Sequence, residues 1–230
     1  MTHEAGTLTP DGVRTMFDRI APVYDLMNRV MTAGLDERWR ALAARAVVQP
    51  GARVLDACCG TGDLALAAER EGGRVTGLDF STEMLARAGR KSSTIVWEQG
   101  DVLALQHPDG SFDAVTVGFG VRNLDDLERG LRELRRVLRP GGGLAILEIT
   151  RPRGALRPFF GLWFERVVPA LGRVLPGGRA YTYLPASVRR FPGAEELAAL
   201  LERCGFEGVG FRLLGGSIVA LHTARAGQAG

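Results

Sequence analysis

The sequence has few cysteines and no long apolar run. Three cysteines, two of them adjacent at Cys58 and Cys59, cannot form a disulfide framework, and their spacing is not that of a metal site. This usage favours a reducing compartment, the cytoplasm. Nowhere do about 18 uncharged apolar residues follow one another, and residues 1–21 carry charges without an apolar core. We therefore expect no signal peptide, no membrane span and no bound metal.

The excess of positive charge is also small. Lys and Arg number 29 against 26 Asp and Glu, a net charge of +3 that is spread along the chain. The sequence contains no basic, aromatic-rich face of the kind that binds nucleic acid, so we expect no nucleic-acid partner. His3 and His107 are expected at the surface and His222 at the end of the last strand, so we assign no catalytic histidine. With 230 residues, 46% of them apolar, the chain is expected to form one globular domain.

Strand-like and helix-like segments alternate in the middle of the sequence. Short β-branched runs are followed by segments of helical periodicity, which is the order of an α/β protein with a parallel sheet. Near the C-terminus, two apolar runs flank Gly215-Gly216-Ser217, which predicts a closing antiparallel hairpin. The expected strands are 53–57, 74–79, 94–98, 114–117, 144–149, 209–214 and 218–222, and the expected helices are 63–70, 81–89, 125–138 and 194–205.

The chain divides into an arm, a core and a short tail. Residues 1–50 are expected to form an N-terminal helical arm that closes over the active site, with two or three helices broken near Pro22 and Gly34. Residues 51–224 are the core, and residues 151–192 form an apolar helical insertion within it. The Ala- and Gly-rich residues 225–230 are predicted to be a disordered tail.

A glycine loop follows the first expected strand. The apolar run that contains Asp56 ends in Gly60-Thr61-Gly62, and a helix begins after it. Open parallel sheets bind ligands at such a turn, because glycines let the ligand approach the backbone and the helix directs its amide groups toward it. Taken alone, this loop also satisfies the relaxed fingerprint of a dinucleotide site, so NAD binding stays open.

Three carboxylates favour S-adenosylmethionine over NAD. Asp79, at the end of the second strand, can accept hydrogen bonds from both ribose hydroxyls of either ligand. Asp56 places negative charge near the loop, which suits the ammonium and sulfonium of a methionine and repels a pyrophosphate. Asp101 can accept from an adenine amino group, and Val102 can pack on the ring. The predicted cofactor-binding residues are Asp56, Gly60, Thr61, Gly62, Asp79, Asp101 and Val102.

Simpler interpretations of these residues stay open. Asp56 can buttress the turn, Asp63 can be a helix N-cap, and Asp101 can stabilise an ordinary turn. Thr61 can bond the methionine carboxylate of the cofactor or merely stabilise the loop. For Cys58 and Cys59 we favour core packing, since neither has a His or Lys nearby in sequence.

Several segments outside the loop carry more specific patterns than the loop itself. They are 24–31 through Trp39, 136–144 with 148–150, 119–123, 181–187 with Phe191-Pro192, and 215–222. These segments resemble those of the ubiquinone and menaquinone biosynthesis C-methyltransferases. The resemblance extends from about Met16 to His222 and departs from the family's usual residues at Thr32, Asp36, Arg139 and Thr150. At Gly118 the family can carry a serine that touches the cofactor, and this contact is not transferred.

The resemblance implies a fold, a cofactor and a reaction. The fold is the class I, Rossmann-like methyltransferase fold, a mostly parallel seven-stranded sheet with a C-terminal antiparallel hairpin and helices on both faces. The reaction is methyl transfer from S-adenosylmethionine to a ring carbon of a prenylated quinol, most simply demethylmenaquinol to menaquinol. A benzoquinol precursor, another small aromatic substrate, or a cofactor-binding module without turnover are the alternatives. Thr61, Asp79, Asp101 and Val102 match the family's cofactor positions.

Four residues are candidates for the chemistry on the quinol. Arg122 and Asn123 follow the fourth strand, where an arginine can stabilise a phenolate and an asparagine can bond a quinol oxygen. Tyr24 and Asp25 could close the site as a hydrogen-bonded pair, with Asp25 taking a proton. The simpler alternatives are an ion pair of Arg122 with Asp125 or Asp126, and a half-buried aromatic at Tyr24.

The insertion is unusually apolar for a connection. It contains Trp163 and Phe164, and arginines flank or interrupt it. A pair of helices packed in the core is one interpretation. The other is a cover that receives the prenyl tail and rests on the inner face of the membrane, which is anionic. A homodimer stays an open alternative to a monomer.

Overall fold

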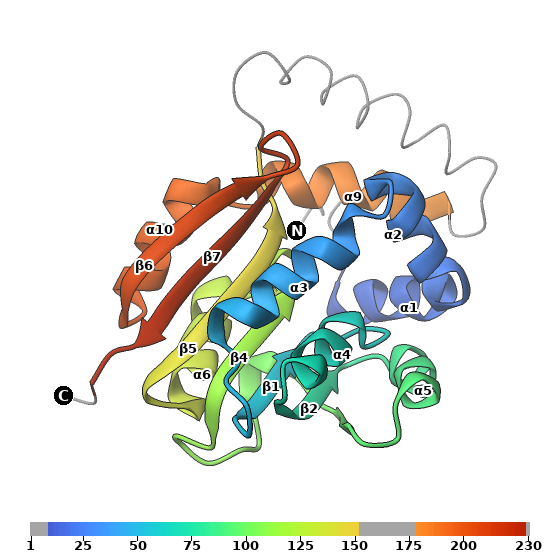
Figure 1. Cartoon of the computed structure of the whole chain (residues 1–230). Helices are drawn as coiled ribbons and strands as arrows, with labels where there is room; N and C mark the ends of the chain where they lie inside the picture. Colours follow the sequence, from blue (N-terminus) through green and yellow to red (C-terminus); the bar gives the residue numbers. More distant parts are fainter. Residues whose placement is uncertain (1–8, 152–177, 229–230) are drawn as a thin grey trace.

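The computed structural model describes residues 9–151 and 178–228, and within them a single seven-stranded sheet dominates (Figure 1). The strand order is β3-β2-β1-β4-β5-β7-β6. Strands β1 to β5 pair in parallel, whereas β7 is antiparallel to both β5 and β6. The mostly parallel sheet with an antiparallel C-terminal hairpin that the sequence predicts is therefore confirmed. The strands are β1 (Arg53–Ala57), β2 (Arg74–Asp79), β3 (Val96–Gln99), β4 (Phe112–Gly118), β5 (Leu138–Ile149), β6 (Phe206–Leu214) and β7 (Val219–Ala226).

The bounds of β1 and β2 are those expected, and the other five strands differ from the expected bounds. β4 and β6 are longer than the expected 114–117 and 209–214. β3 begins two residues late, since the Thr94 hydroxyl is used in a hydrogen bond to Glu69. β5 begins six residues early, because Leu138 already pairs with Phe112 before an irregularity in the register. β7 extends to Ala226, so residues 225 and 226 belong to the sheet and not to a disordered tail.

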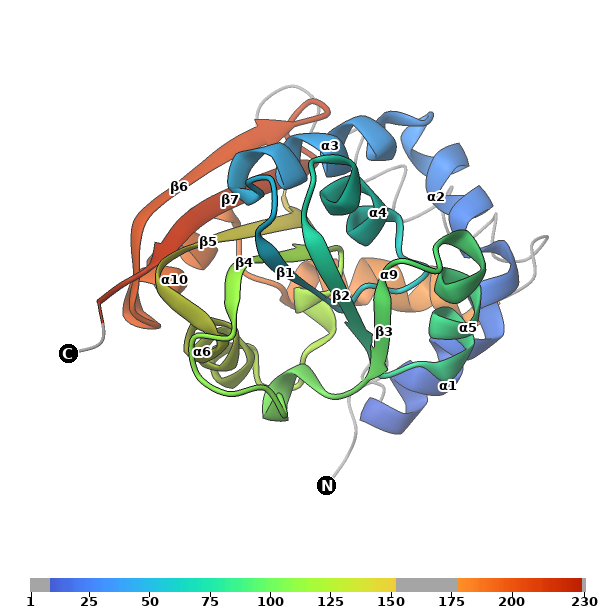
Figure 2. The ribbon, with the colours of Figure 1, turned by 60° about the horizontal axis from the view of Figure 1, so that its bottom comes forward.

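Helices cover both faces of the sheet (Figure 2). Helices α3 (Leu35–Val47) and α4 (Asp63–Arg70) bury alanines and Trp39 against one face, and α6 (Leu127–Val137) and α10 (Ala194–Arg203) bury leucines against the other. Both faces of β1 are consequently buried, Leu55 on one and Val54 on the other, as in a parallel sheet covered on both sides. The remaining helix of the core, α5 (Thr82–Lys91), follows β2.

The N-terminal arm lies beside α5. Within the expected arm of residues 1–50, α3 packs on the sheet, so the name arm is kept here for α1 (Pro10–Ile20), the 3₁₀ turn η1 (Ala21–Val23) and α2 (Tyr24–Thr32). The helices break at Pro22 and at Ala33-Gly34. Ala33 and Gly34 both adopt positive φ, which ends α2 before α3 begins. The two expected breaks are confirmed. A small cluster joins α1 to α5 and α9 (Gly178–Arg190) through Met16, Met84 and Tyr183.

Part of the predicted insertion lies outside the described residues, including Trp163 and Phe164. Of its expected residues 151–192, the structure describes Arg151, the helix α9 and Phe191 with Pro192. Among the helices described, none combines the length and the apolar character that a membrane crossing requires.

Candidate functional site

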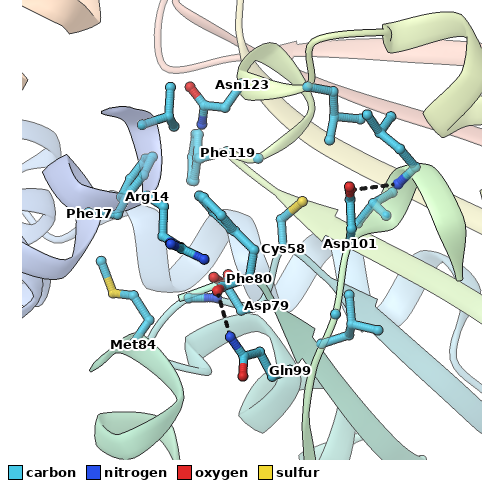
Figure 3. Close-up of a pocket in the computed structure, with 18 of the residues that line it drawn as sticks. Arg14, Phe17, Cys58, Asp79, Phe80, Met84, Gln99, Asp101, Phe119 and Asn123 are labelled. Carbon is cyan, nitrogen blue, oxygen red and sulfur yellow. Dashed lines mark hydrogen bonds between the residues drawn. The ribbon is translucent and has the colours of Figure 1, made fainter. Parts of the chain in front are cut away.

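A cavity of about 480 Å³ opens at the carboxyl ends of β1 to β4 (Figure 3). The turns that follow these four strands supply most of its wall, and the arm supplies the rest. This is the edge of an open parallel sheet at which ligands bind. The turns contribute Cys58, Gly60, Leu78 to Phe80, Gln99 to Leu103, Gly118 to Gly120 and Asn123 to Asp125, while the helices contribute Asp11, Val13, Arg14, Phe17, Tyr24 and Met84.

The glycine loop joins β1 to α4 through a run of left-handed residues. Cys58, Gly60 and Gly62 have φ of 54°, 55° and 86°. A Cβ at Gly60 would meet no protein atom within 4 Å, so a side chain there would take up cavity space. Gly62 faces the protein instead, where a Cβ would lie 2.5 Å from the Trp97 ring. Because Gly62 is the N-cap of α4, the N-cap interpretation of Asp63 is wrong.

Asp79 lines the cavity on the side where the cofactor is predicted to bind, and it connects the turn after β1 to the turn after β2. One of its carboxylate oxygens accepts the Gly60 N–H at 2.8 Å and the other accepts the Ser81 N–H at 2.9 Å. Burial raises the pKa of this carboxyl to about 6, and the backbone hydrogen bonds from Ser81 and Gly60 act against that rise. Each oxygen keeps a lone pair for a second donor, so a buried acceptor faces the cavity.

Asp101 and Val102 form the wall after β3. Asp101 caps the short 3₁₀ turn η2 (Val102–Ala104), with its carboxylate accepting the Leu103 N–H at 2.9 Å. The turn interpretation is therefore correct, and Asp101 also lines the cavity. Val102 is buried and presents an apolar surface to the same space.

Asp56 lies behind the loop and does not line the cavity. It is fully buried, and it accepts a hydrogen bond from the Thr116 hydroxyl on the neighbouring strand β4 at 2.8 Å. Burial raises the pKa of this carboxyl to about 7, against the Thr116 hydrogen bond and the charge of Arg40. Any action of Asp56 on a ligand is therefore through its charge and not through contact.

This raised pKa predicts how stability depends on pH. The folded state holds the Asp56 proton up to about pH 7, whereas an unfolded chain loses it near pH 3.8. The free energy of unfolding should therefore fall as pH rises through this window, by at most about 1.4 kcal/mol per pH unit for one group. Denaturant titrations at pH 5 and pH 8 give the free energy of unfolding at each pH. Between these two values it should fall less in Asp56→Asn than in the wild type.

Asp113→Asn is the matched control for this pH effect. The Arg53 N–H and side chain hold the pKa of Asp113 at about 2, so this group is charged at both pH values in the folded and the unfolded chain. The control should keep the wild-type difference between pH 5 and pH 8. If Asp56→Asn showed the same difference in the free energy of unfolding between pH 5 and pH 8 as the wild type, the effect could not be assigned to Asp56.

The opposite wall carries Tyr24 and Asn123 among apolar groups. Asn123 follows β4, and its Oδ1 accepts a hydrogen bond from the Tyr183 hydroxyl of α9 at 3.1 Å. Loss of water around Tyr24 raises the pKa of its phenol, with the charge of Arg122 acting in the opposite direction. Phe119 also lines the cavity, and the Arg40 guanidinium carbon lies over its ring, 5.4 Å from the centroid.

Arg122 lies beside this wall without lining the cavity. Its Nη1 donates to Glu148 Oε1 on β5 at 2.7 Å and to the Phe119 carbonyl at 2.5 Å. The side chains of Arg122 and Glu148 are 7% and 1% exposed, so the pair is buried. The alternative interpretation of Arg122, an ion pair with Asp125 or Asp126, is wrong, because its partner Glu148 stands on the neighbouring strand.

Asp25 does not pair with Tyr24, so that prediction is also wrong. Its Oδ1 accepts a hydrogen bond from the Thr61 hydroxyl at 2.5 Å, and its Oδ2 lies 2.6 Å from Lys91 Nζ. Thr61 is 2% exposed and does not line the cavity. The cavity therefore brings together Gly60, Asp79, Asp101, Val102, Tyr24 and Asn123, and it leaves Asp56, Thr61, Gly62, Asp25 and Arg122 in its surroundings.

Sequence reasoning missed several cavity residues. Phe17, Phe80 and Met84 supply apolar wall, and Gln99 donates from its amide to the Phe80 carbonyl at 3.3 Å. Phe80 and Gln99 directly follow or end predicted strands, a position that could have marked them. Cys59 is buried as expected, whereas Cys58 is half-buried and also lines the cavity.

Three comparisons relate this chain to known proteins. The sequence model of the ubiE/COQ5 methyltransferase family matches residues 5–226. A demethylmenaquinone methyltransferase of Thermus thermophilus is 44% identical over 90% of this chain and 98% of that protein, and one of Deinococcus radiodurans is 46% identical over 84% of each. Among solved structures, a SAM-dependent methyltransferase of Thermotoga maritima matches 92% of this chain and 99% of that chain, with a TM-score of 0.68 at 20% identity. That last likeness concerns the fold.

Proposed function

Since the chain belongs to the ubiE/COQ5 methyltransferase family, we propose that it methylates a ring carbon of demethylmenaquinol to give menaquinol. It is a methyltransferase, and S-adenosylmethionine is its methyl donor. The observation that supports this substrate is that the cavity in the described residues brings the Asp79 side next to an aromatic and amide wall. The names of the relatives at 44% and 46% identity support the naphthoquinol over a benzoquinol precursor.

The cofactor side of the cavity fits an adenosine and a methionine. S-adenosylmethionine supplies an electrophilic methyl group on a sulfonium. Asp79 would accept the ribose hydroxyls with its free lone pairs, and Gly60 leaves room for the ligand because it has no side chain. Asp101 would accept a hydrogen bond from the adenine amino group, and Val102 would pack on the adenine ring. From behind the loop, the charge of Asp56 would favour the cationic end of the cofactor.

The quinol side needs alignment and a way to hold a phenolate. Because Asn123 Oδ1 accepts from Tyr183, its amide N–H groups remain to donate to a quinol oxygen. Tyr24 offers a hydroxyl on the same wall. Arg122 supplies a buried positive charge beside this wall, which stabilises a ring oxygen that loses its proton and so increases electron density at the adjacent carbon. Much of the rate enhancement is then expected from orientation and exclusion of water.

Transfer of a labelled methyl group tests this proposal. Purified protein is given labelled S-adenosylmethionine with demethylmenaquinol in one reaction and a benzoquinol precursor in another. Label in the naphthoquinol is expected, and label in the benzoquinol alone would reassign the substrate. Absence of label in both, with tight cofactor binding, would favour a module without turnover. Calorimetry with NAD beside S-adenosylmethionine tests the remaining alternative.

We also propose peripheral contact with the inner face of the membrane. The substrate's prenyl tail belongs in a bilayer, and the arm that lines the cavity carries an exposed apolar patch on its outer side. In this patch Leu26 and Val30, four residues apart on α2, are each 65% exposed. Clustered exposure of this kind is typical of an interaction surface. A homodimer formed through the patch is the alternative, and size-exclusion chromatography distinguishes the two.

Charges placed in this patch should weaken membrane binding. Leu26→Glu with Val30→Glu is expected to lower binding to vesicles that contain anionic lipid at least 10-fold, since burying one such side chain contributes about 1.5–3 kcal/mol. Val96→Glu is the matched control, because Val96 is 56% exposed on the edge strand β3. Sedimentation with vesicles measures the effect, and equal binding of both variants would contradict the proposal.

A further inference from the structure

The arm repeats an aromatic-aspartate dipeptide, Phe17-Asp18 and Tyr24-Asp25, at a spacing of seven residues. In each dipeptide the aromatic side chain lines the cavity, while the aspartate accepts a hydrogen bond from a hydroxyl of the core. Each dipeptide therefore combines a piece of the cavity wall with a connection to the core.

Asp18 connects the arm to the turn after β2. Its Oδ1 accepts a hydrogen bond from the Ser81 hydroxyl at 2.5 Å. Ser81 is fully buried, and its Oγ also accepts the Met84 N–H at 3.1 Å, because Ser81 is the N-cap of α5. If Ser81 moved, α5 would lose its N-cap. Asp18 is therefore hydrogen-bonded to a residue whose position α5 keeps fixed.

Asp25 connects the arm to the glycine loop. Besides its hydrogen bond from the Thr61 hydroxyl, Asp25 forms an ion pair with Lys91, whose Nζ also lies 2.6 Å from Asp63 Oδ1. Lys91 is the only lysine in the sequence, and its side chain is 27% exposed.

Asp18 and Asp25 connect the arm to the turn after β2 and the glycine loop, and the same two segments form hydrogen bonds to Asp79. Gly60, the neighbour of Thr61, donates its N–H to one oxygen of Asp79, and Ser81 donates its N–H to the other. Phe17 packs against the turn after β2 and against the second dipeptide, with its ring 6.3 Å from that of Phe80 and 6.2 Å from that of Tyr24, both edge to face.

We propose that Asp18 and Asp25 are positioning residues of the methyl transfer, which couple cofactor binding at Asp79 to the placement of Phe17 and Tyr24 against the substrate. The proposal rests on the proposed function for the identity of the substrate. A ligand bound to Asp79 orders the turns that the arm holds, and a bound arm orders the same turns for the ligand. Cofactor binding and arm closure should therefore favour each other by the same factor.

Acylation of Lys91 by an amine-reactive ester reports arm closure, because the ion pair with Asp25 exists only with the arm in place. The rate is followed by mass spectrometry of the peptide that contains Lys91, with and without saturating S-adenosylhomocysteine. In the wild type this ligand should slow acylation about 10-fold, within the usual range of coupling between sites. In Asp18→Ala, which leaves every contact of Lys91 in place, the ratio should fall below about 2-fold.

Asp63→Asn is the matched control, because it removes the other partner of Lys91 without touching the arm. It should react faster in both conditions and keep the wild-type ratio. Equal ratios in the wild type and Asp18→Ala would overturn the proposal. Thermal melting confirms that each variant is folded, and Asp18→Asn, which keeps the hydrogen-bond acceptor, should restore most of the ratio.

Kinetics separate positioning from simple stability. Asp18→Ala should raise KM for the quinol about 10-fold, with Asp18→Asn near the wild type, since a hydrogen bond to a charged group is worth about that factor. A loss of kcat and melting temperature together, without rescue by Asp18→Asn, would contradict a positioning role. Failure of the proposed function is a separate result: the wild type would transfer no methyl group to either quinol while its Lys91 stays protected by the cofactor product.

Discussion

Asparagine in place of Asp79 is expected to weaken binding of S-adenosylmethionine about 100-fold, because two hydrogen bonds from the ribose would lose their charged acceptor. The fold should survive with reduced stability. Asparagine removes a charge that burial disfavours, but its amide nitrogen cannot accept a hydrogen bond, so one of the two N–H groups of Gly60 and Ser81 loses its acceptor. Isothermal titration calorimetry gives the dissociation constant, and thermal melting measures the change in stability.

The dependence on pH gives a second test at the same residue. Below about pH 6 the Asp79 carboxyl takes up a proton, so the affinity of the wild type should fall as pH is lowered through this value. Asp79→Asn should lack that fall. Asp113→Asn is the control, since Asp113 pairs with Arg53 and Arg139 and does not line the cavity. If Asp79→Asn bound the cofactor as tightly as this control, Asp79 would not be the ribose acceptor.

Glu148→Gln is expected to destabilise the protein by about 3–5 kcal/mol, because it leaves the charge of Arg122 buried without its partner. Glu148 also accepts the N–H groups of Arg122 and Ile149, at 3.3 and 2.9 Å, so the turn after β4 would lose its support from β5. Asn123 is part of that turn, and methyl transfer should fall together with stability. Urea unfolding at pH 7 and labelled methyl transfer measure the two effects.

The matched control is Glu128→Gln on the surface of α6. Glu128 pairs with Arg132 one helical turn away, and the two side chains are 45% and 62% exposed. The same substitution in this solvated pair should cost less than about 1 kcal/mol. A similar loss in both variants would mean that burial does not set the strength of the Arg122–Glu148 pair.

The cavity lies at the sheet edge where the sequence predicts a ligand, and this edge was predictable because the relevant signals are local. The β-branched run before Gly60 and the carboxylate at the end of β2 are neighbours in sequence of the turns they form, and the bounds of β1, β2 and α4 agree with the expected ones. The expected strand 144–149 was too short, since the run of glycines that interrupts its pattern forms part of β5.

Partners that lie far apart in sequence were not predictable in the same way. Local reasoning paired Arg122 with Asp125 or Asp126 and Tyr24 with Asp25, but Arg122 finds Glu148 on the neighbouring strand and Asp25 finds Thr61 and Lys91 on the core. These pairs depend on strand order and on the placement of the arm. A repeated Phe-Asp and Tyr-Asp at two helical turns was the one local signal for the arm's role.

The position of β7 has a consequence for synthesis of the chain. β7 is the last strand along the sequence, yet it lies between β5 and β6, with Ile149 of β5 paired to Val219. At about 5–20 residues per second, the ribosome needs several seconds to pass from the end of β5 to β7. During that time one edge of β5 has no partner strand, and open strand edges pair readily with other chains. The order of the strands therefore makes this edge of β5 the part of the sheet that is open longest during synthesis on the β7 side.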